Sequence, residues 1–247
     1  MATGTARHGL ARVLSKRGVC SRSEAARWIA AGRVSVDGRV VRDPEFPIVV
    51  SGSARIAVDG RDIDDPARLY LMVNKPRGLV TTANDERGRD TVYRCLDGAQ
   101  WKGAPLPWLA PVGRLDQASE GLLLFCNDPA WAARVTDPQT GPDKTYHVQV
   151  DTVPDDHLLA ALMQGVSDEG VVLRAKSARL LRSGERNAWL EIVLDEGRNR
   201  QIRRLLGAFD IGVLRLVRVA IGDLVLGDLP KGQWRVLTDT EIATVGT

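Results

Sequence analysis

One short run of the sequence combines a carboxylate, a guanidinium and the pattern of a buried strand. Residues 112–128 read VGRLDQASEGLLLFCND, so Asp116 stands two positions after Arg114. The apolar run 121–126 is bounded by polar and turn residues, which is typical of a strand buried on both faces. An acid at the mouth of such a strand suits a nucleophile or an electrostatic stabiliser. The same spacing also fits an Asp that caps a turn or pairs with Arg114 on the surface.

The charge of the chain is concentrated at one end. The 247 residues carry a net charge of +3, and a chain of this length has room for two domains. Residues 1–42 alone hold nine basic and two acidic residues, a net charge of +7, so the remainder totals −4. A basic module of this kind predicts nucleic-acid binding, although a solvated basic face without a partner has the same pattern. The residues expected to contact RNA phosphates here are Arg12, Lys16, Arg17, Arg22, Arg27 and Arg33.

The cysteines and the hydropathy pattern bear on the compartment. Cys20, Cys95 and Cys126 are scattered and form no CxxC pair, so neither a zinc site nor a disulfide framework is expected. The N-terminal residues lack the apolar core of a signal peptide, and no apolar run approaches the length of a membrane span. We therefore expect a cytoplasmic protein with no metal and no membrane partner.

The N-terminal residues have the pattern of a small α+β module. Residues 10–17 place apolar side chains on one helical face, and Ser21 with Glu24 forms a capping box that opens a second helix. Hairpins are expected around Asp37-Gly38 and Asp59-Gly60, because these dipeptides are flanked by alternating apolar residues.

The rest of the chain predicts a larger α+β body with more strand than helix. We predict a first domain over residues 1–63, a linker over 64–68 and a second domain over 69–247. Residues 83–111 are expected to be loops with room for one short helix. The other elements expected in the second domain are strands over 69–75, 144–150, 189–194, 215–225 and 234–237, and helices over 129–137, 157–165 and 199–206.

Four segments of the second domain carry chemistry-bearing residues in a specific order. They are LMVNKPRGLVTT (71–82), GRLD (113–116), KTYHVQV (144–150) and EGRNRQIRRLLG (196–207). In order and approximate spacing, this set resembles the pseudouridine synthases of the RsuA/RluB type, which isomerise uridine in ribosomal RNA. The segment GVCSRSEAARWIAAGRVSVDGRVV (18–41) resembles the S4 RNA-binding module that precedes the catalytic domain in that family. The resemblance covers about residues 10–240.

The resemblance implies a fold and a reaction. The fold is a small S4-like (αL) domain followed by a mixed, mainly antiparallel β-sheet catalytic domain with peripheral helices. The reaction breaks the N1–C1′ bond of uridine, turns the base and joins C5 to C1′, and it needs no cofactor. A carboxylate stabilises the positive charge that develops at C1′. By matching the family's motifs, Asp116 is the nucleophile or base, between which the sequence does not distinguish.

The remaining site residues also follow from the resemblance. Tyr146 matches the active-site tyrosine that stacks on the uracil. Arg203 matches the arginine that keeps the aspartate ionised, with Arg204 as the less favoured choice. Arg114 is expected to hold the base out of its helix. Residues expected to contact phosphate are Arg198, Arg200 and Arg204, together with Lys75 and Arg77, for which a scaffold role is equally consistent.

The expected partner is ribosomal RNA or a ribosomal assembly intermediate, and the protein is expected to act as a monomer. The large-subunit (23S) RNA is favoured over the small-subunit RNA by the S4-like segment and by residues 167–181. A rival hypothesis is a non-catalytic S4-type RNA-binding assembly factor. An S4-bearing methyltransferase would need a glycine-rich loop after a strand, and the sequence has none.

Overall fold

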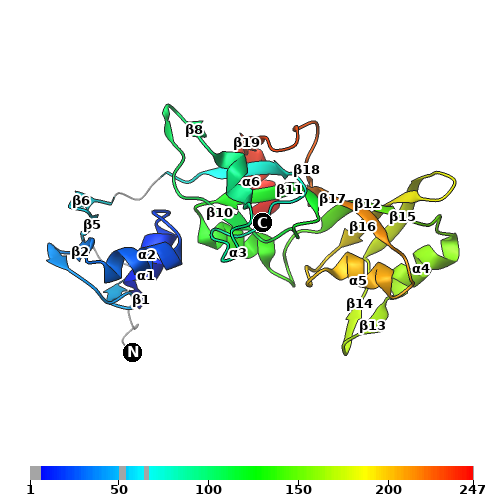
Figure 1. Cartoon of the computed structure of the whole chain (residues 1–247), viewed down its shortest axis with the longest axis horizontal. Helices are drawn as coiled ribbons and strands as arrows, with labels where there is room; N and C mark the ends of the chain where they lie inside the picture. Colours follow the sequence, from blue (N-terminus) through cyan, green and yellow to red (C-terminus); the bar gives the residue numbers. More distant parts are fainter. Residues whose placement is uncertain (1–6, 50–53, 64–66, 247) are drawn as a thin grey trace. The chain divides into compact units, whose positions relative to one another are not determined.

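The computed structural model describes residues 7–49, 54–63 and 67–246, which form two compact units (Figure 1). The first unit holds the described residues up to Leu69, together with 98–110 and 126–129, and the second unit holds the rest. The predicted linker, residues 64–68, falls mainly on 64–66, which lie outside the described residues.

In the first unit, two helices and small antiparallel sheets surround one apolar core. The helices α1 and α2 pack against each other, β1 pairs with β4, and the order of the small sheet is β3–β2–β5–β6. Leu10, Leu14 and Ile29 from the helices meet Val34 and Ile56 from the strands, and none of the five is more than 1% exposed. The elements of this unit are β1 (Arg7–Gly9), α1 (Leu10–Lys16), α2 (Arg22–Ala30), β2 (Val34–Val36), β3 (Arg39–Val40), β4 (Pro47–Val49), β5 (Ile56–Val58), β6 (Arg61–Asp62), β8 (Gln100–Trp101) and β9 (Ala104–Pro105).

The local signals read from this part of the sequence are confirmed. The Ser21 hydroxyl accepts a hydrogen bond from the Glu24 N–H at 3.1 Å and so caps α2. The turn residues Asp37 and Gly38 have φ of 50° and 79°, and Asp59 and Gly60 have 51° and 76°. Two consecutive residues with positive φ are what a tight two-residue hairpin requires.

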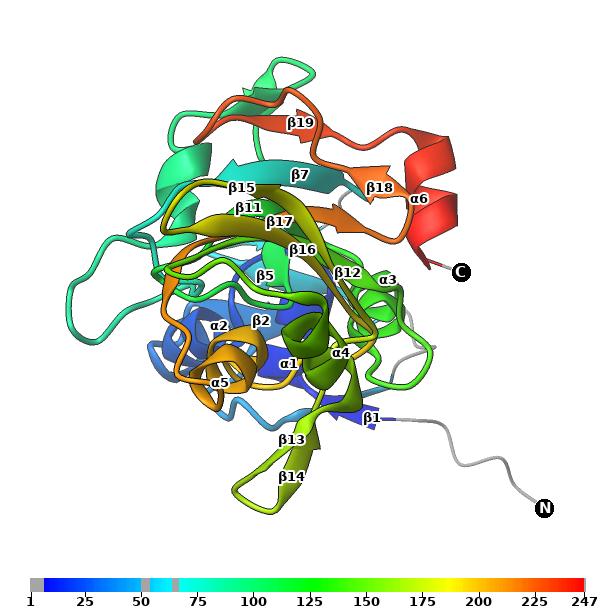
Figure 2. The ribbon, with the colours of Figure 1, turned by 90° about the vertical axis from the view of Figure 1, so that its right-hand side faces the viewer.

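The second unit is built on one large mixed sheet. Within the described residues, nine strands follow the order β15–β16–β12–β17–β11–β7–β19, with β10 beside β11 and β18 beside β17. The strands β11 and β17 are parallel, whereas β12 pairs antiparallel with both β16 and β17. The helices α4 and α5 lie on the same side of β12, β15 and β16 (Figures 1 and 2). The predicted mixed, mainly antiparallel sheet with peripheral helices is therefore confirmed.

The bounds of these elements differ from the prediction mainly where the sequence lacks a clear period. The 3₁₀ helix in the region 83–111 is the one short helix expected there, whereas the short strands of that region, the hairpin β13–β14 and the strand β15 were not predicted. The elements are β7 (Tyr70–Lys75), η1 (Val92–Leu96), β10 (Ala110–Val112), β11 (Glu120–Cys126), α3 (Pro129–Thr136), β12 (Lys144–Val150), α4 (Asp156–Gln164), β13 (Val166–Asp168), β14 (Val171–Leu173), β15 (Ser177–Ser183), β16 (Ala188–Leu194), α5 (Gln201–Gly207), β17 (Val213–Ile221), β18 (Leu224–Val225), β19 (Trp234–Val236) and α6 (Asp239–Gly246).

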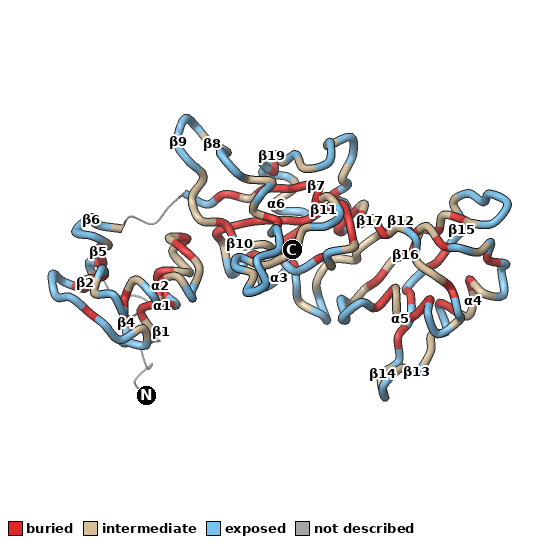
Figure 3. Tube along the Cα trace, in the orientation of Figure 1, coloured by how far each residue is buried: buried red, intermediate tan, exposed pale blue. Residues whose placement is uncertain are grey.

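The centre of the sheet is buried and tightly packed. Every residue of β11 is buried, and so is β7 after its first residue (Figure 3). At the start of β11, Gly121 has φ of +100°, and a Cβ there would lie 2.2 Å from the carbonyl oxygen of Arg218 on β17. Only glycine permits this approach, so Gly121 brings the beginning of β11 directly against β17, where the candidate site lies.

Candidate active site

Asp116 lies on the loop of residues 113–119, which enters β11 and is called the Asp116 loop below. The Asp116 side chain is 35% exposed, and the loop turns so that the Ser119 N–H donates to the Asp116 carbonyl at 3.0 Å. The strand that follows is buried on both faces, as the sequence predicted. The carboxylate therefore stands at the edge of a rigid strand with one side open to solvent.

A buried lysine holds this loop by its backbone. The Nζ of Lys75, at the end of β7, donates to the carbonyl oxygens of Pro76 at 3.1 Å, Asp116 at 3.2 Å and Ser119 at 2.8 Å. Lys75 is 0% exposed, so the prediction that it contacts RNA is wrong, and its alternative scaffold role is the one the structure supports. Burial lowers the pKa of Lys75 to about 8, although the charges of Asp116 and Glu120 oppose this.

The segment after β7 fastens the same loop a second time. The Thr81 hydroxyl donates to the Leu115 carbonyl at 2.7 Å, and the Gly78 N–H donates to the Gln117 carbonyl at 2.8 Å. Thr81 was not predicted as a site residue, and its only sequence signal is its place in the segment 71–82. The residues before and after Asp116 are thus both tied to one buried strand end.

Two arginines of the EGRNRQIRR segment approach Asp116 in different ways. The Arg200 Nη1 lies 3.7 Å from Asp116 Oδ2, and Arg200 precedes α5 with a left-handed φ of 49°. Arg203 instead donates to the carbonyls of Ala118 and Val213, each at 3.3 Å. Among the described residues, the ion pair expected for Arg203 is made by Arg200. The sequence predicted only a phosphate contact for Arg200.

Arg203 still acts on the site through its charge. Burial lowers its pKa, the charge of Arg200 lowers it further, and the charge of Asp116 raises it. Its Nε is buried without a hydrogen-bond partner. Arg203 therefore contributes a half-buried positive charge close to Asp116 and anchors the Asp116 loop at Ala118.

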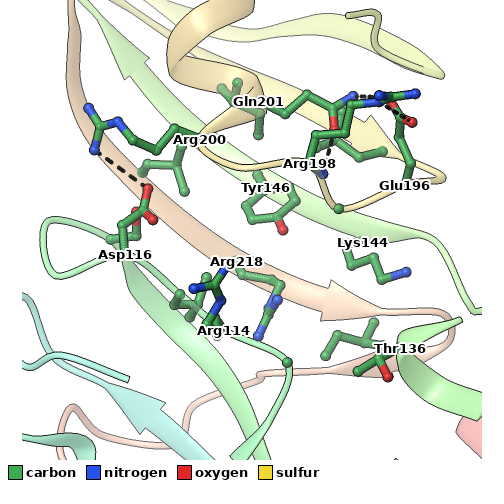
Figure 4. A pocket seen from close by; sticks show the side chains of 18 of the residues that line it. Arg114, Asp116, Thr136, Lys144, Tyr146, Glu196, Arg198, Arg200, Gln201 and Arg218 are labelled. Carbon is green, nitrogen blue, oxygen red and sulfur yellow. Dashed lines mark hydrogen bonds and ion pairs between the residues drawn. The ribbon is translucent and has the colours of Figure 1, made fainter. Parts of the chain in front are cut away.

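A cavity of about 530 Å³ opens beside the carboxylate. Tyr146 forms part of its wall from β12, is 9% exposed, and lies between Asp116 on one side and Lys144 on the other (Figure 4). Across the strand pair, Tyr146 is in register with Arg218 of β17. The structure therefore brings the predicted Asp116, Tyr146, Arg200 and Arg203 to one cavity, whose polar wall also includes Arg114, Ser119, Lys144, Glu196, Arg198, Gln201 and Arg218.

Of the other arginines predicted around this cavity, two are exposed and one forms an ion pair within the described residues. Arg114 and Arg77 are exposed, and Arg114 lines the cavity. Arg198 is paired with Glu196 at 2.7 Å, so much of its charge is already neutralised. Gln201, which was not predicted as a site residue, donates to Glu196 at 2.7 Å and accepts from the Arg198 N–H at 3.1 Å.

Arg204 forms ion pairs away from Asp116. Its Nε lies 2.6 Å from Asp168 and its Nη2 lies 3.2 Å from Glu169, both on the β13–β14 hairpin. The predicted phosphate contact of Arg204 is therefore replaced by two ion pairs that fasten this hairpin to α5. Its less favoured alternative, the pairing with Asp116, is excluded by the same geometry.

The basic residues of the first unit lie at its surface, and several are already paired. Arg12 is exposed, Lys16 lies 3.0 Å from His8, and Arg17 has polar contacts within the chain. The ion pairs are Arg22 with Glu45 at 3.0 Å, Arg27 with Glu24 at 4.0 Å and Arg33 with Asp59 at 2.5 Å. The Arg33 guanidinium also lies 5.0 Å from the centre of the Trp28 ring. RNA would have to compete with these carboxylates for three of the six side chains.

Two segments of the chain match the models of known protein families. Residues 69–208 match the family model described as RNA pseudouridylate synthase, and residues 9–51 match that of the S4 domain. The chain belongs to the RNA pseudouridylate synthase family. The resemblance read from the four sequence segments is thereby confirmed.

Two relatives of this pseudouridylate synthase match it along more than nine-tenths of their own length. An uncharacterized RNA pseudouridine synthase of Rickettsia bellii is 37% identical and covers 93% of this chain and 96% of its own. The ribosomal large subunit pseudouridine synthase B of Bacillus subtilis is 35% identical, and the match covers 94% of this chain and 93% of the relative. A crystal structure of a pseudouridylate synthase superimposes with a TM-score of 0.64 at 28% identity, and the match covers 96% of this chain and 99% of that one.

The described residues contain neither a metal-binding cluster nor a membrane-spanning helix. No group of three or more His, Cys, Asp or Glu in the described part of this synthase is arranged to hold a metal ion. Nor does any helix there have the length and apolarity needed to cross a membrane.

Proposed function

We propose that this synthase isomerises one uridine of ribosomal RNA to pseudouridine and that the large-subunit RNA is its target. The observation that carries the proposal is the carboxylate of Asp116, ion-paired with Arg200 at the edge of a cavity that Tyr146 lines. The cavity's volume of about 530 Å³ lies in the range of small-molecule sites, so it suits an extruded nucleotide. The Bacillus subtilis relative, named for the large ribosomal subunit, supports the choice of RNA.

The chemistry requires a carboxylate that stays ionised next to the sugar. The N1–C1′ bond breaks with its electron pair going to the base, and C1′ becomes positive. Asp116 stabilises that charge or bonds to C1′. The base then turns, C5 bonds to C1′, and the proton lost from C5 is balanced by one gained at N1. Atoms and electrons balance without a second substrate, so the reaction needs no cofactor.

Two arginines place positive charge beside Asp116. Arg200 pairs with its carboxylate directly at 3.7 Å, and Arg203 adds a half-buried charge. Tyr146 supplies an aromatic wall on which uracil can stack. The catalytic set is therefore Asp116, Tyr146 and Arg203, with Arg200 added.

RNA binding is divided between the two parts of the chain. Arg114, exposed in the cavity wall, and the exposed Arg77 contact the RNA around the target, and Arg114 holds the base in its extruded position. The basic residues of the S4 domain contact phosphates elsewhere on the RNA. We assign the S4-like domain to residues 1–63, a linker to 64–68 and the catalytic domain to 69–247. The protein works in the cytoplasm as a monomer on ribosomal RNA or an assembly intermediate.

Two other functions remain as outcomes of the test. A small-subunit target would use the same cavity, and a non-catalytic assembly factor would use only the RNA-binding surfaces. The intact set of Asp116, Tyr146 and two arginines at one cavity favours catalysis.

The experiment is a carbodiimide map of pseudouridine in ribosomal RNA from cells with and without the gene. We expect one large-subunit position to lose its signal in the deletion strain and to regain it with the wild-type gene but not with Asp116→Asn. A lost position in the small-subunit RNA would overturn the choice of target. An unchanged map would overturn the enzymatic function in favour of the binding role.

A further inference from the structure

Two cations in the cavity wall form no ion pair with any residue in the described part of the chain. Lys144 of β12 and Arg218 of β17 both line the cavity, across it from Asp116 (Figure 4). Arg218 is 5% exposed and Lys144 is half-buried. Among the residues that the structure describes, neither has a carboxylate oxygen within 4.0 Å. By contrast, three other arginines of this unit, Arg204, Arg215 and Arg235, each pair with a carboxylate.

The two cations are neighbours of Tyr146 and of each other. Arg218 faces Tyr146 across the β12–β17 pair, and Lys144 precedes Tyr146 by two residues, so its side chain is on the same face of β12. Burial lowers the pKa of Lys144, and the charge of Arg218 lowers it further, against the opposing charges of Asp143 and Asp195. Two like charges are thus held close together in a partly desolvated place.

Arg218 is held firmly although its charge is uncompensated. Its Nε donates to the Leu122 carbonyl at 2.7 Å, while its Nη2 is buried without a hydrogen-bond partner. Burying a charge without a partner is costly in free energy. Such an arrangement is typical of functional sites, where the partner arrives with the substrate or forms during the reaction.

We propose that Lys144 and Arg218 stabilise the negative charge that appears on the uracil ring when its bond to the ribose breaks. This inference rests on the proposed isomerisation. Cleavage of N1–C1′ leaves the electron pair on the base, where the charge spreads over N1, O2 and O4. A base stacked on Tyr146 lies beside both cations, while the positive C1′ faces Asp116. Fixed charges at both ends of the breaking bond stabilise its transition state.

The charge on the base vanishes again later in the reaction. When C5 has bonded to C1′, loss of the C5 proton and protonation of N1 restore a neutral base. The two cations therefore favour the separated state over both substrate and product. A phosphate oxygen of the RNA is the other anion that could meet these cations, and the experiment distinguishes the two sources.

The test uses the full-length protein and transcripts of the ribosomal RNA segment that carries the mapped uridine. One transcript contains uridine and the other contains 5-fluorouridine, whose fluorine stabilises the detached base as an anion. Because fluorine replaces the C5 hydrogen, the second transcript ends at a C5-linked base that keeps its fluorine and takes up water, and its rate is measured as the consumption of 5-fluorouridine. Single-turnover rates at saturating enzyme are measured by chromatography of the nuclease-digested RNA. Dissociation constants are measured by filter binding. The variants are Lys144→Met, which keeps the length of the side chain, the conservative Lys144→Arg, and Lys102→Met as an exposed control.

We expect Lys144→Met to lower the rate on the uridine transcript at least ~10-fold, with the dissociation constant changed less than about 2-fold. On the 5-fluorouridine transcript the defect should shrink, since that base needs less stabilisation. Lys144→Arg should recover most of the rate, and Lys102→Met should match the wild type.

Three results would overturn the inference. They are an unchanged rate in Lys144→Met, an equal defect on both transcripts, and a loss of RNA affinity that accounts for the rate, which would assign the cations to a phosphate. If the wild type isomerises neither transcript, the proposed function itself fails.

Discussion

Two carboxylates four positions apart in the sequence have opposite surroundings. Asp116 is 35% exposed, and one arginine approaches it at 3.7 Å. Glu120, at the start of β11, is 4% exposed and is held by Arg215 at 2.8 Å and Lys231 at 2.5 Å. Burial alone would raise the pKa of Glu120, but the hydrogen bonds from its two partners lower it below its ordinary value.

The difference separates an acid that reacts from an acid that holds the fold. The bonds to Arg215 and Lys231 connect β11 to later parts of the chain, and they occupy both oxygens of Glu120. Asp116 is fixed by its backbone through Lys75 instead, and its carboxylate has only the 3.7 Å pair with Arg200 among the described residues. A loop clamped by its carbonyl groups can be rigid and still present a free side chain.

The largest expected effect is on catalysis at Asp116. Asp116→Asn should lower the single-turnover rate at least ~100-fold, because the neutral amide cannot stabilise a positive C1′. Its free energy of unfolding, measured with urea, should change by less than about 0.5 kcal/mol, since the side chain is partly exposed and loosely paired. A large loss of stability in this variant would remove the distinction between the two acids.

Glu120→Gln should show the reverse pattern. We expect it to lower the free energy of unfolding by roughly 1–3 kcal/mol, less than for a fully buried pair because its partners are partly exposed. The rate measured well below the melting temperature should fall less than about 10-fold. Glu185→Gln, at an exposed position, is the matched control and should be neutral.

The pH dependence of stability tests whether the ion pairs of Glu120 stabilise the fold. Because the folded state lowers the pKa of Glu120 below 4.5, its contribution is complete above that pH and is lost as the pH falls through the folded-state value. The difference in unfolding free energy between wild type and Glu120→Gln should therefore shrink in strongly acidic buffer. Urea titrations at neutral and acidic pH would measure it. A constant difference would refute the ion pairs as its source.

The two arginines near Asp116 should differ from each other. Arg200→Gln removes the direct pair and should lower the rate about 10-fold without a large change in stability. Arg203→Gln removes a charge and two carbonyl contacts, so it should lower both the rate and the stability. Kinetics and urea unfolding of the two variants in parallel would test this, and identical losses would contradict it.

The smallest effect is expected at Arg204. Arg204→Gln releases the β13–β14 hairpin from α5 and should cost about 1 kcal/mol or less, because Glu169 is largely exposed. The rate should stay within about 2-fold of the wild type, measured at saturating enzyme. A rate loss as large as that of Arg200→Gln would mean that Arg204 acts on the substrate.

Much of the fold was predictable from local patterns. The capping box at Ser21, the Asp-Gly hairpins and the buried strand after Asp116 all depend on residues that are close in sequence. The hairpin β13–β14 was missed although Glu169 and Gly170 form a tight turn there, with φ of 49° and 77°. Its strands are three residues long, too short to show a clear period.

The site was predictable in its residue types but less so in its contacts. The motif resemblance selected Asp116, Tyr146 and an arginine-rich segment, and these line one cavity. It selected Arg203 for the pair with Asp116, whereas Arg200 makes that pair, because the αL conformation of Arg200 turns the segment before α5 begins. It did not select Lys75 as a buried clamp, since a lysine in a turn has no sequence signal for burial.

The sequence by itself determined the family, the order of the main elements and the acid at the mouth of a buried strand, because periodicity and motif spacing are properties of neighbouring residues. Only the tertiary structure decided which charges meet: Arg200 with Asp116, Arg204 with the hairpin, and Lys144 beside Arg218 with no carboxylate within 4.0 Å in the described part of the chain. These pairings join segments far apart in the chain, and their energies depend on distance and burial, which no linear pattern contains.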